Sequence, residues 1–217
     1  YSDPGNITCR NMFFAIWKQL SHYFLDVEYE NLFFEILNEP HGNLTADKWN
    51  VLLPQVLDTI REIDQERTLI IDVPEYGYHG FLDKLVIPET EQNAIVSVRY
   101  YLPYDFTHQG AHWASGSGEW LRTTWTATGS QKNGVKTDLS TIKKWSRRHL
   151  RPITIGEFGA IINADHQSRV IWTDYVTDQF EKQGFSWSYF DFGVYFKAYN
   201  LNTDQWLEGF PEALLGE

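Results

Sequence analysis

The chain has 217 residues, 42% of them hydrophobic and 16% aromatic, so one core can be buried and a single domain over residues 1–217 is expected. The formal net charge of −11 opposes phosphate backbones and anionic lipids, which argues against nucleic acid and membrane partners. A single cysteine, Cys9, excludes an intramolecular disulfide. The sequence has no signal-peptide pattern and no apolar stretch of about 18 residues, so no membrane span is expected.

Apolar periodicity predicts the elements of the first half of the chain. An amphipathic helix is expected over residues 11–26, and the apolar run over 32–38 predicts a strand buried on both faces. Thr45 is expected to cap the next helix, in which Pro54 introduces a kink or delays the regular part. Residues 68–73 and 94–101 predict two further strands. The segment between them predicts a loop with at most one helical turn.

The second half continues the alternation of strands and helices. Residues 103–137 predict a long aromatic loop, which over one face of a barrel is typical of a binding wall. A helix from Thr137 or Asp138 to His149, a strand over 152–156, a helix over 165–183 and a strand over 185–191 follow. Five strands with about three to four main helices predict an α/β fold, a truncated TIM-type (β/α) barrel, because a complete barrel needs about 250 residues.

Two glutamates stand where buried strands end. Glu39 follows the strand over 32–38 and precedes Pro40, and Glu157 follows the strand over 152–156, with a glycine directly before it and another two residues after it. In an α/β barrel all strands open at their carboxyl ends onto one face, so distant carboxylates can converge there. Hydrolysis of a glycosidic bond needs one protonated and one ionised carboxyl group. The pattern therefore predicts a glycosidase.

Three segments resemble the motifs of glycoside hydrolase family 5, whose best-known members are endoglucanases: Ile36-Leu-Asn-Glu-Pro40, Ile155-Gly-Glu-Phe-Gly159 and Tyr100-Tyr-Leu-Pro-Tyr-Asp-Phe-Thr-His108. The similarity runs over essentially the whole chain. It implies a retaining enzyme that needs no cofactor and acts on a β-linked oligo- or polysaccharide.

The resemblance also implies roles for single residues. Glu39 would be the acid/base and Glu157 the nucleophile. Asn38 matches the family asparagine that binds the sugar 2-hydroxyl, and Tyr101 matches the tyrosine whose hydroxyl contacts the nucleophile.

This chain departs from the family pattern at three points. Family members usually have histidine two residues before the tyrosine, where this chain has Arg99. In the last strand Phe190 stands where a tryptophan is common, which offers a smaller platform to the substrate. The strands that bring an arginine near the nucleophile and a histidine pair near the substrate are absent. The hypothesis is that Arg99 partly replaces the missing charge beside Glu157.

The remaining candidates are aromatic or imidazole side chains. Flat aromatic faces suit sugar rings, and the candidate substrate-binding residues are His108, Trp113, Trp120, Trp187 and Phe190, with Trp125 as a further platform. His108 and His112 have a metal-like spacing, but no carboxylate or cysteine nearby completes a ligand set, so no metal is expected. Asp191 is either a third carboxylate of the cleft or a hydrogen-bonded residue at a strand end.

The favoured interpretation is a β-1,4-glucanase that a microbe exports. A β-glucosidase, xylanase or mannanase remains an alternative, as does a catalytically weak remnant that only binds carbohydrate. The missing strands would leave the first and last strands as exposed edges. The N-terminal helix, the segment over 103–137, or a second copy of the chain in a homodimer would cover them.

Overall fold

The computed structural model describes residues 7–216. Five strands form one sheet in the order β1-β2-β3-β4-β5: β1 (Phe34–Glu35), β2 (Leu69–Asp72), β3 (Ala94–Tyr100), β4 (Ile153–Phe158) and β5 (Ser186–Tyr189). The pairs β1–β2, β2–β3 and β4–β5 are parallel. The main helices are α1 (Ile7–Tyr23), α2 (Ala46–Arg61), α4 (Gly129–His149) and α5 (His166–Gln183). The fold is α/β, a truncated TIM-type barrel, as predicted.

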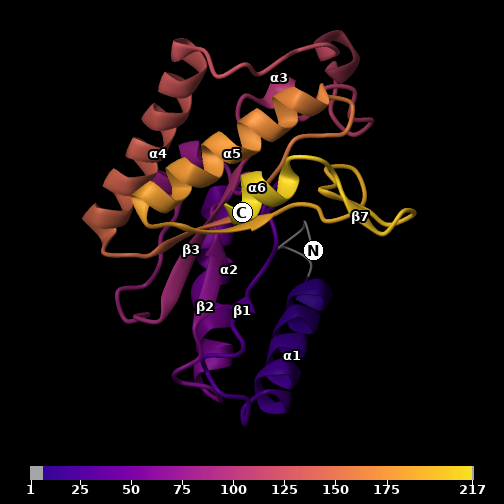
Figure 1. Cartoon of the computed structure of the whole chain (residues 1–217). Coiled ribbons are helices and arrows are strands. Elements are labelled where there is room, and N and C mark those ends of the chain that lie inside the picture. Colours follow the sequence, from indigo (N-terminus) through magenta and orange to yellow (C-terminus); the bar gives the residue numbers. More distant parts are fainter. Residues whose placement is uncertain (1–6, 217) are drawn as a thin grey trace. The chain divides into compact units, whose positions relative to one another are not determined.

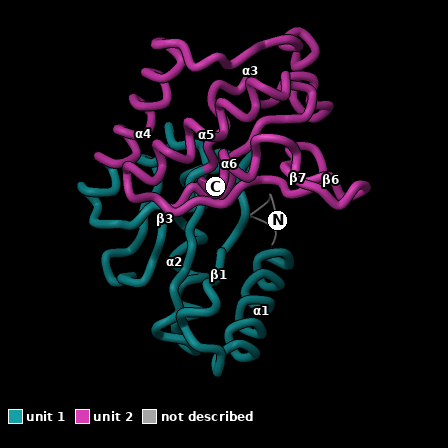
Figure 2. The backbone as a smooth tube through the Cα atoms, in the orientation of Figure 1, with its two compact units in different colours: residues 1–98, 145–153 teal, residues 99–144, 154–217 magenta. Residues whose placement is uncertain are grey.

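The chain divides into two compact units (Figure 2). The first comprises the described part of residues 1–98 together with 145–153, and the second comprises 99–144 with the described part of 154–217. The single domain expected from the sequence stays a prediction.

In the first unit, α1 runs beside β1 (Figure 1). The indole N–H of Trp17 donates to the carbonyl oxygen of Ile36 at 3.1 Å, and its ring packs on Phe34 with centroids 5.4 Å apart. The N-terminal helix, one of the three covers expected for the exposed strand edges, therefore packs against β1. The homodimer stays a prediction.

The next helix, α2, turns one apolar face into the core of this unit. Its side chains at helical spacing are fully buried: Trp49, Leu53, Val56 and Ile60. Thr45 occupies the N-cap position, but its side chain makes no capping hydrogen bond. Pro54 lies inside a helix that runs unbroken from Ala46 to Arg61, so the expectation that it delays the regular part is wrong. The connector after β2 contains the short 3-10 helix η1 (His79–Lys84). Its six residues make about two turns, so the expectation of at most one helical turn is wrong.

A buried arginine organises the turn between α1 and β1. Arg67 is 0% exposed and donates to Asp64 Oδ2 at 2.9 Å. It also donates to the carbonyl oxygens of Phe24 at 2.8 Å and Val27 at 2.9 Å. A buried guanidinium is tolerated only when its donors are used. The sequence pattern gave no indication of this cluster.

In the second unit, α4 begins earlier than predicted. Thr128 and Gln131 form a capping box, in which Gln131 N–H donates to Thr128 Oγ1 at 3.3 Å and Thr128 N–H donates to Gln131 Oε1 at 3.0 Å. The helix therefore starts at Gly129, and the expectation of a loop up to residue 137 is wrong. The segment before it contains α3 (Tyr104–Thr107) and the 3-10 helix η2 (Ser117–Trp120).

The rest of this unit packs around α5. Asp165 caps α5 by accepting from Ser168 N–H at 2.8 Å, so the predicted helix over 165–183 is confirmed. After β5 come an antiparallel hairpin, β6 (Tyr199–Asn200) with β7 (Gln205–Trp206), and α6 (Phe210–Leu215), which packs on α5 (Figure 1). The sequence reading ended at β5 and missed these elements.

Candidate active site

Glu39 lies in a bend of the chain that follows β1 in the first unit. Its backbone has φ of 48°, in the left-handed region that residues with a Cβ rarely adopt. Its N–H donates to Asp72 Oδ2 at 2.8 Å, and its carbonyl oxygen accepts from His41 Nδ1. Glu39 is half-buried and Asn38 is exposed.

Asp72, the last residue of β2, is a site residue that the sequence reading missed. Its side chain is fully buried, although it carries a carboxylate. The only signal in the sequence was a charged residue at the end of an apolar strand run, Leu69-Ile-Ile-Asp72. Aspartate at that position needs a donor, and Glu39 supplies one.

Glu157 lies near the end of β4 in the second unit, where two side chains from the β3 end meet it. Tyr101 donates its hydroxyl proton to Glu157 Oε2 at 2.9 Å. Arg99 places Nε 3.5 Å from Glu157 Oε1, which is an ion pair longer than an ordinary hydrogen bond. The arginine side chain is 3% exposed and the glutamate side chain 20%. The structure thus brings together three of the residues singled out in the sequence.

His108 is held in a defined tautomer beside Tyr101. Thr107 uses its single hydroxyl proton on the carbonyl oxygen of Tyr101 at 2.6 Å, so toward His108 Nδ1, 3.0 Å away, it can only accept. The proton therefore sits on Nδ1 and leaves Nε2 as an acceptor. Burial lowers the pKa of His108 from 6.5 to about 4, so the ring is neutral near pH 7.

Aromatic rings surround His108 in the same unit. Tyr104 stacks on it with ring centroids 4.1 Å apart and 20° between the planes. Trp113 packs against it in a T-shaped arrangement, with ring centroids 6.2 Å apart. Trp113 is 45% exposed, whereas Trp120 is half-buried with its ring 5.8 Å from that of Tyr104. Trp113 therefore exposes more of its ring to a ligand than Trp120 does.

The other aromatic candidates take separate positions. Phe190 follows β5 and is 42% exposed. Trp187 lies within β5, with Nε1 3.4 Å from Glu181 Oε1 on α5 and its ring against Phe158. Trp125 is 0% exposed, so its proposed use as a sugar platform is wrong. A buried ring has no face left for a sugar.

Asp191 holds a turn beyond β5. Its Oδ1 accepts from Val194 N–H at 2.6 Å and its Oδ2 from Tyr195 N–H at 3.0 Å. Of the two interpretations offered for it, the hydrogen-bonded residue at a strand end matches this geometry.

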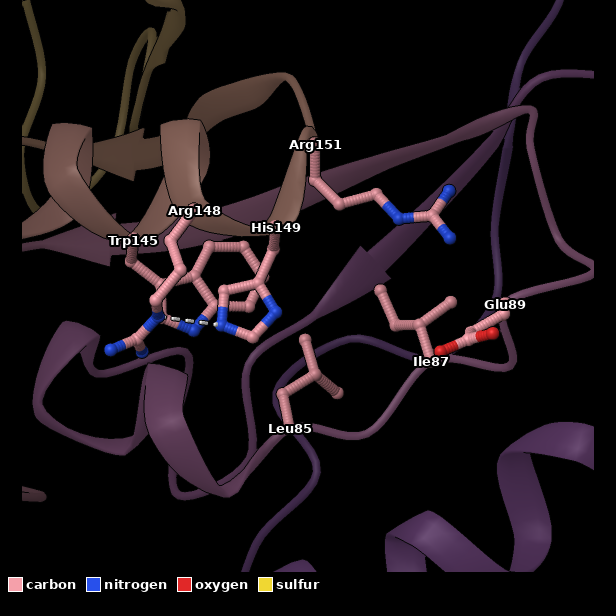
Figure 3. Close-up of a pocket in the computed structure, with 7 residues that line it drawn as sticks. All are labelled: Leu85, Ile87, Glu89, Trp145, Arg148, His149 and Arg151. Carbon is pink, nitrogen blue, oxygen red and sulfur yellow. Dashed lines mark hydrogen bonds between the residues drawn. The ribbon is translucent and has the colours of Figure 1, made fainter.

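A separate cavity of about 250 Å³ opens in the first unit (Figure 3). It lies between the segment leading into β3 and the end of α4, and its lining includes Leu85, Ile87, Trp145, His149 and Arg151. The rings of Trp145 and His149 stack with centroids 4.4 Å apart, and Arg151 donates to the carbonyl oxygen of Pro88 at 3.4 Å. The cavity therefore adjoins the amino end of β3, whereas Glu39 follows the carboxyl end of β1.

Residues 7–216 contain neither a candidate metal site nor a membrane-spanning helix. No three or more histidine, cysteine, aspartate or glutamate side chains in this part of the chain are grouped so that they could hold a metal ion. None of its helices is long and apolar enough to cross a membrane.

Comparison with known proteins identifies the family. The model of the cellulase family, glycosyl hydrolase family 5, matches residues 3–195. The chain therefore belongs to glycosyl hydrolase family 5. Endoglucanase H of Acetivibrio thermocellus is 34% identical over 191 residues, which cover 88% of this chain and 19% of that protein. The chain thus spans about a fifth of this curated relative.

Solved structures of the Thermotoga maritima endoglucanase Cel5A are similar throughout the chain. The complex with cellobiose is 43% identical, with a TM-score of 0.91, and the match covers 94% of this chain and 66% of that one. The complex with mannotriose is 42% identical, with a TM-score of 0.93, and the match covers 96% and 67%.

Proposed function

We propose that this chain carries the catalytic residues of a retaining glycoside hydrolase that cleaves β-1,4-glucosidic bonds of cellulose or related plant cell-wall β-glucans. The observation that carries the proposal is the hydrogen bond at 2.9 Å from the Tyr101 hydroxyl to Glu157, at a strand end of a family 5 chain. The cellobiose complex of a similar protein supports glucan as the substrate class.

In the first step, Glu157 attacks the anomeric carbon while Glu39 gives its proton to the glycosidic oxygen. The carbon–oxygen bond breaks, the leaving sugar departs with that proton, and a covalent glycosyl-enzyme forms. The Tyr101 hydroxyl donates to one oxygen of the attacking carboxylate, and the positive charge of Arg99 lies 3.5 Å from the other. Asn38 would bind the sugar 2-hydroxyl.

In the second step, Glu39 acts as the base. It removes a proton from a water molecule, the water oxygen attacks the anomeric carbon, and Glu157 is released as a carboxylate. A retaining enzyme needs its two carboxyl groups about 5–5.5 Å apart for this exchange. Neither step requires a cofactor.

Sugar binding is assigned to the rings near His108. Neutral His108 offers Nε2 as an acceptor for a sugar hydroxyl, and the exposed face of Trp113 suits the C–H face of a pyranose ring. Trp120, Trp187 and Phe190 remain proposed contacts. Because a similar enzyme was solved with mannotriose, β-mannan is the second polymer to test. Cellulose and related β-glucans are too large to enter cells, so we propose that the enzyme acts outside a microbial cell.

The nucleophile can be identified by covalent trapping. A 2-deoxy-2-fluoro-β-cellobioside with a dinitrophenyl leaving group slows the second step, so the glycosyl-enzyme should accumulate and add one sugar mass to the intact protein. Peptide mapping should place the label on Glu157. Glu157→Gln should remain unlabelled, while Glu212→Gln on α6 should label like the wild type. A label on another carboxylate would reject the assignment.

The enzyme and a binding remnant are separated by a substrate panel. Purified protein should release reducing sugar from soluble β-glucan faster than from xylan or mannan. Release from xylan or mannan alone would move the specificity to those alternatives. No release from any β-glycoside, with retained migration shift in a glucan affinity gel, would favour the remnant.

A further inference from the structure

The backbone of Glu39 adopts a conformation that its own sequence does not favour. A residue with a Cβ held at positive φ costs on the order of 1–3 kcal/mol and persists only where neighbouring groups fix it. Glu39 has φ of 48°. The groups that bind the peptides on either side of Glu39 therefore determine the position from which its side chain extends.

Asp72 holds the peptide on the amino side. The backbone ladder between β1 and β2 continues to the bond from Ile36 N–H to the carbonyl oxygen of Ile70, at 3.0 Å. Three residues later, Glu39 N–H finds a side chain instead of a backbone acceptor, Asp72 Oδ2 at 2.8 Å. Because Asp72 is fully buried in β2, this acceptor has a fixed position.

The turn after β2 holds the peptides on the carboxyl side. His41 donates Nδ1–H to the carbonyl oxygen of Glu39, and its ring stacks on Tyr76 with centroids 4.1 Å apart. Glu75 N–H donates to the carbonyl oxygen of Pro40 at 2.7 Å. His41 and Tyr76 are exposed, so within this set Asp72 is the contact most shielded from water.

We propose that Asp72 is a positioning residue for the acid/base Glu39, acting through the hydrogen bond from the Glu39 backbone N–H to its buried carboxylate. This inference rests on the proposed function. A general acid must lie within hydrogen-bond reach of the oxygen it protonates, and a misplacement of 1 Å can cost about 100-fold in rate. Loss of the Asp72 acceptor therefore impairs the proton transfer from Glu39 and leaves the attack by Glu157 intact.

Leaving groups of different basicity separate this role from general damage. A methyl or phenyl β-cellobioside needs a proton on its leaving oxygen, whereas a 2,4-dinitrophenyl β-cellobioside departs without one. Asp72→Leu keeps the size of the side chain but removes the acceptor. It should lower kcat/KM about 100-fold on the phenyl substrate and less than about threefold on the dinitrophenyl substrate, provided that formation of the glycosyl-enzyme is measured. Asp72→Asn keeps an acceptor oxygen and should restore most of the loss.

A matched control lies next to Asp72. Trp49 is fully buried and donates Nε1–H to the backbone carbonyl oxygen of Asp72 at 3.3 Å. This bond goes to the backbone of Asp72 and not to its side-chain carboxylate. Trp49→Phe should lower the melting temperature while the ratio between the two substrates stays at the wild-type value. If Asp72→Leu fails to fold, Asp72→Ala, which also removes the acceptor, replaces it in the comparison of the two substrates.

The outcomes separate a failure of the proposed function from a failure of the role of Asp72. A wild type that is inactive on every glycoside would overturn the proposed function and this inference with it. An active wild type whose Asp72→Leu variant loses both substrates equally, or neither, would overturn the inference alone. An Asp72→Asn variant as selective in its loss as Asp72→Leu would also overturn it, because the acceptor is still present.

Discussion

The hydroxyl of Tyr101 lies 2.9 Å from Oε2 of Glu157, and Arg99 Nε lies 3.5 Å from the other oxygen of the same carboxylate. One neutral donor and one cation therefore share the two oxygens. Together they contact the carboxylate group at both of its oxygens. The hydrogen bond also fixes the side-chain direction, which a longer ion pair does less well.

Tyr101→Phe should lower kcat/KM on aryl β-cellobiosides about 10- to 100-fold, because a hydrogen bond to a charged group contributes roughly 1.5–3 kcal/mol. Initial rates at several substrate concentrations would measure it. Tyr199→Phe is the control, since its hydroxyl bonds to Asp204 at 2.7 Å in the hairpin. Equal losses in both variants would show that the hydroxyl of Tyr101 has no special role.

Arg99→His should lower kcat/KM roughly tenfold at pH 7.5, where a neutral imidazole no longer supplies the positive charge beside Glu157. Arg99→Lys keeps a charge and should lose less. Arg148→His, which removes an exposed arginine paired with Asp83, should leave the rate unchanged. Unchanged or higher activity in Arg99→His would refute the hypothesis that this arginine replaces the charge of the missing one.

Buried His108 should make the protein less stable in acid. Its pKa is about 4 in the folded chain and 6.5 unfolded, so below pH 6.5 the unfolded chain binds more protons. The stability that the neutral ring contributes is present above pH 6.5 and is lost progressively as the pH falls to about 4. The difference amounts to about 3 kcal/mol.

His108→Gln should remove that part of the pH dependence. Urea unfolding at pH 7.5 and pH 4.5 would give the free energy of unfolding for each variant. His22→Gln, at an exposed position on α1, should keep the wild-type difference between the two pH values. The expectation fails if His108→Gln is destabilised by acid as much as the wild type.

Elements with an apolar period were predictable from the sequence. The five strands lie within two or three residues of the predicted runs. Burial on both faces, expected for the run over 32–38, is found in β2 and β3 but is wrong for β1, where Glu35 is exposed, and β5 has no fully buried residue. The start of α4 was missed because residues 129–137 are mostly polar. Only the pair Thr128 and Gln131 marks the N-terminal end of this helix. The hairpin β6–β7 was missed because its strands have two residues each.

Partners of buried polar groups were not predictable in the same way. Arg67 reads as an ordinary charge between two elements, and its role depends on the backbone carbonyl oxygens that the fold brings to it. Asp72 likewise depends on an N–H that lies 33 residues away in the chain. By contrast, Tyr101 and Glu157 were paired through the family motifs, and the structure places them in contact.

Gly159 should not tolerate a side chain, because the residue after β4 and the residue after β5 approach each other there. A Cβ built on Gly159 would lie 2.0 Å from the carbonyl oxygen of Phe190, far inside the closest contact that atoms allow, and the obstacle is backbone. Gly159→Ala should therefore lower the free energy of unfolding by about 1–3 kcal/mol or prevent folding, as overpacking does in cores. Thermal unfolding followed by circular dichroism would measure the loss.

The control for this substitution is Gly134, which lies in α4 and has nothing within 4 Å of a built Cβ. Gly134→Ala should raise the free energy of unfolding by up to about 1 kcal/mol, because alanine is the better helix former. The two variants add the same methyl group and should shift the melting temperature in opposite directions. If Gly159→Ala unfolds at the wild-type temperature, the close approach of Phe190 does not constrain this position.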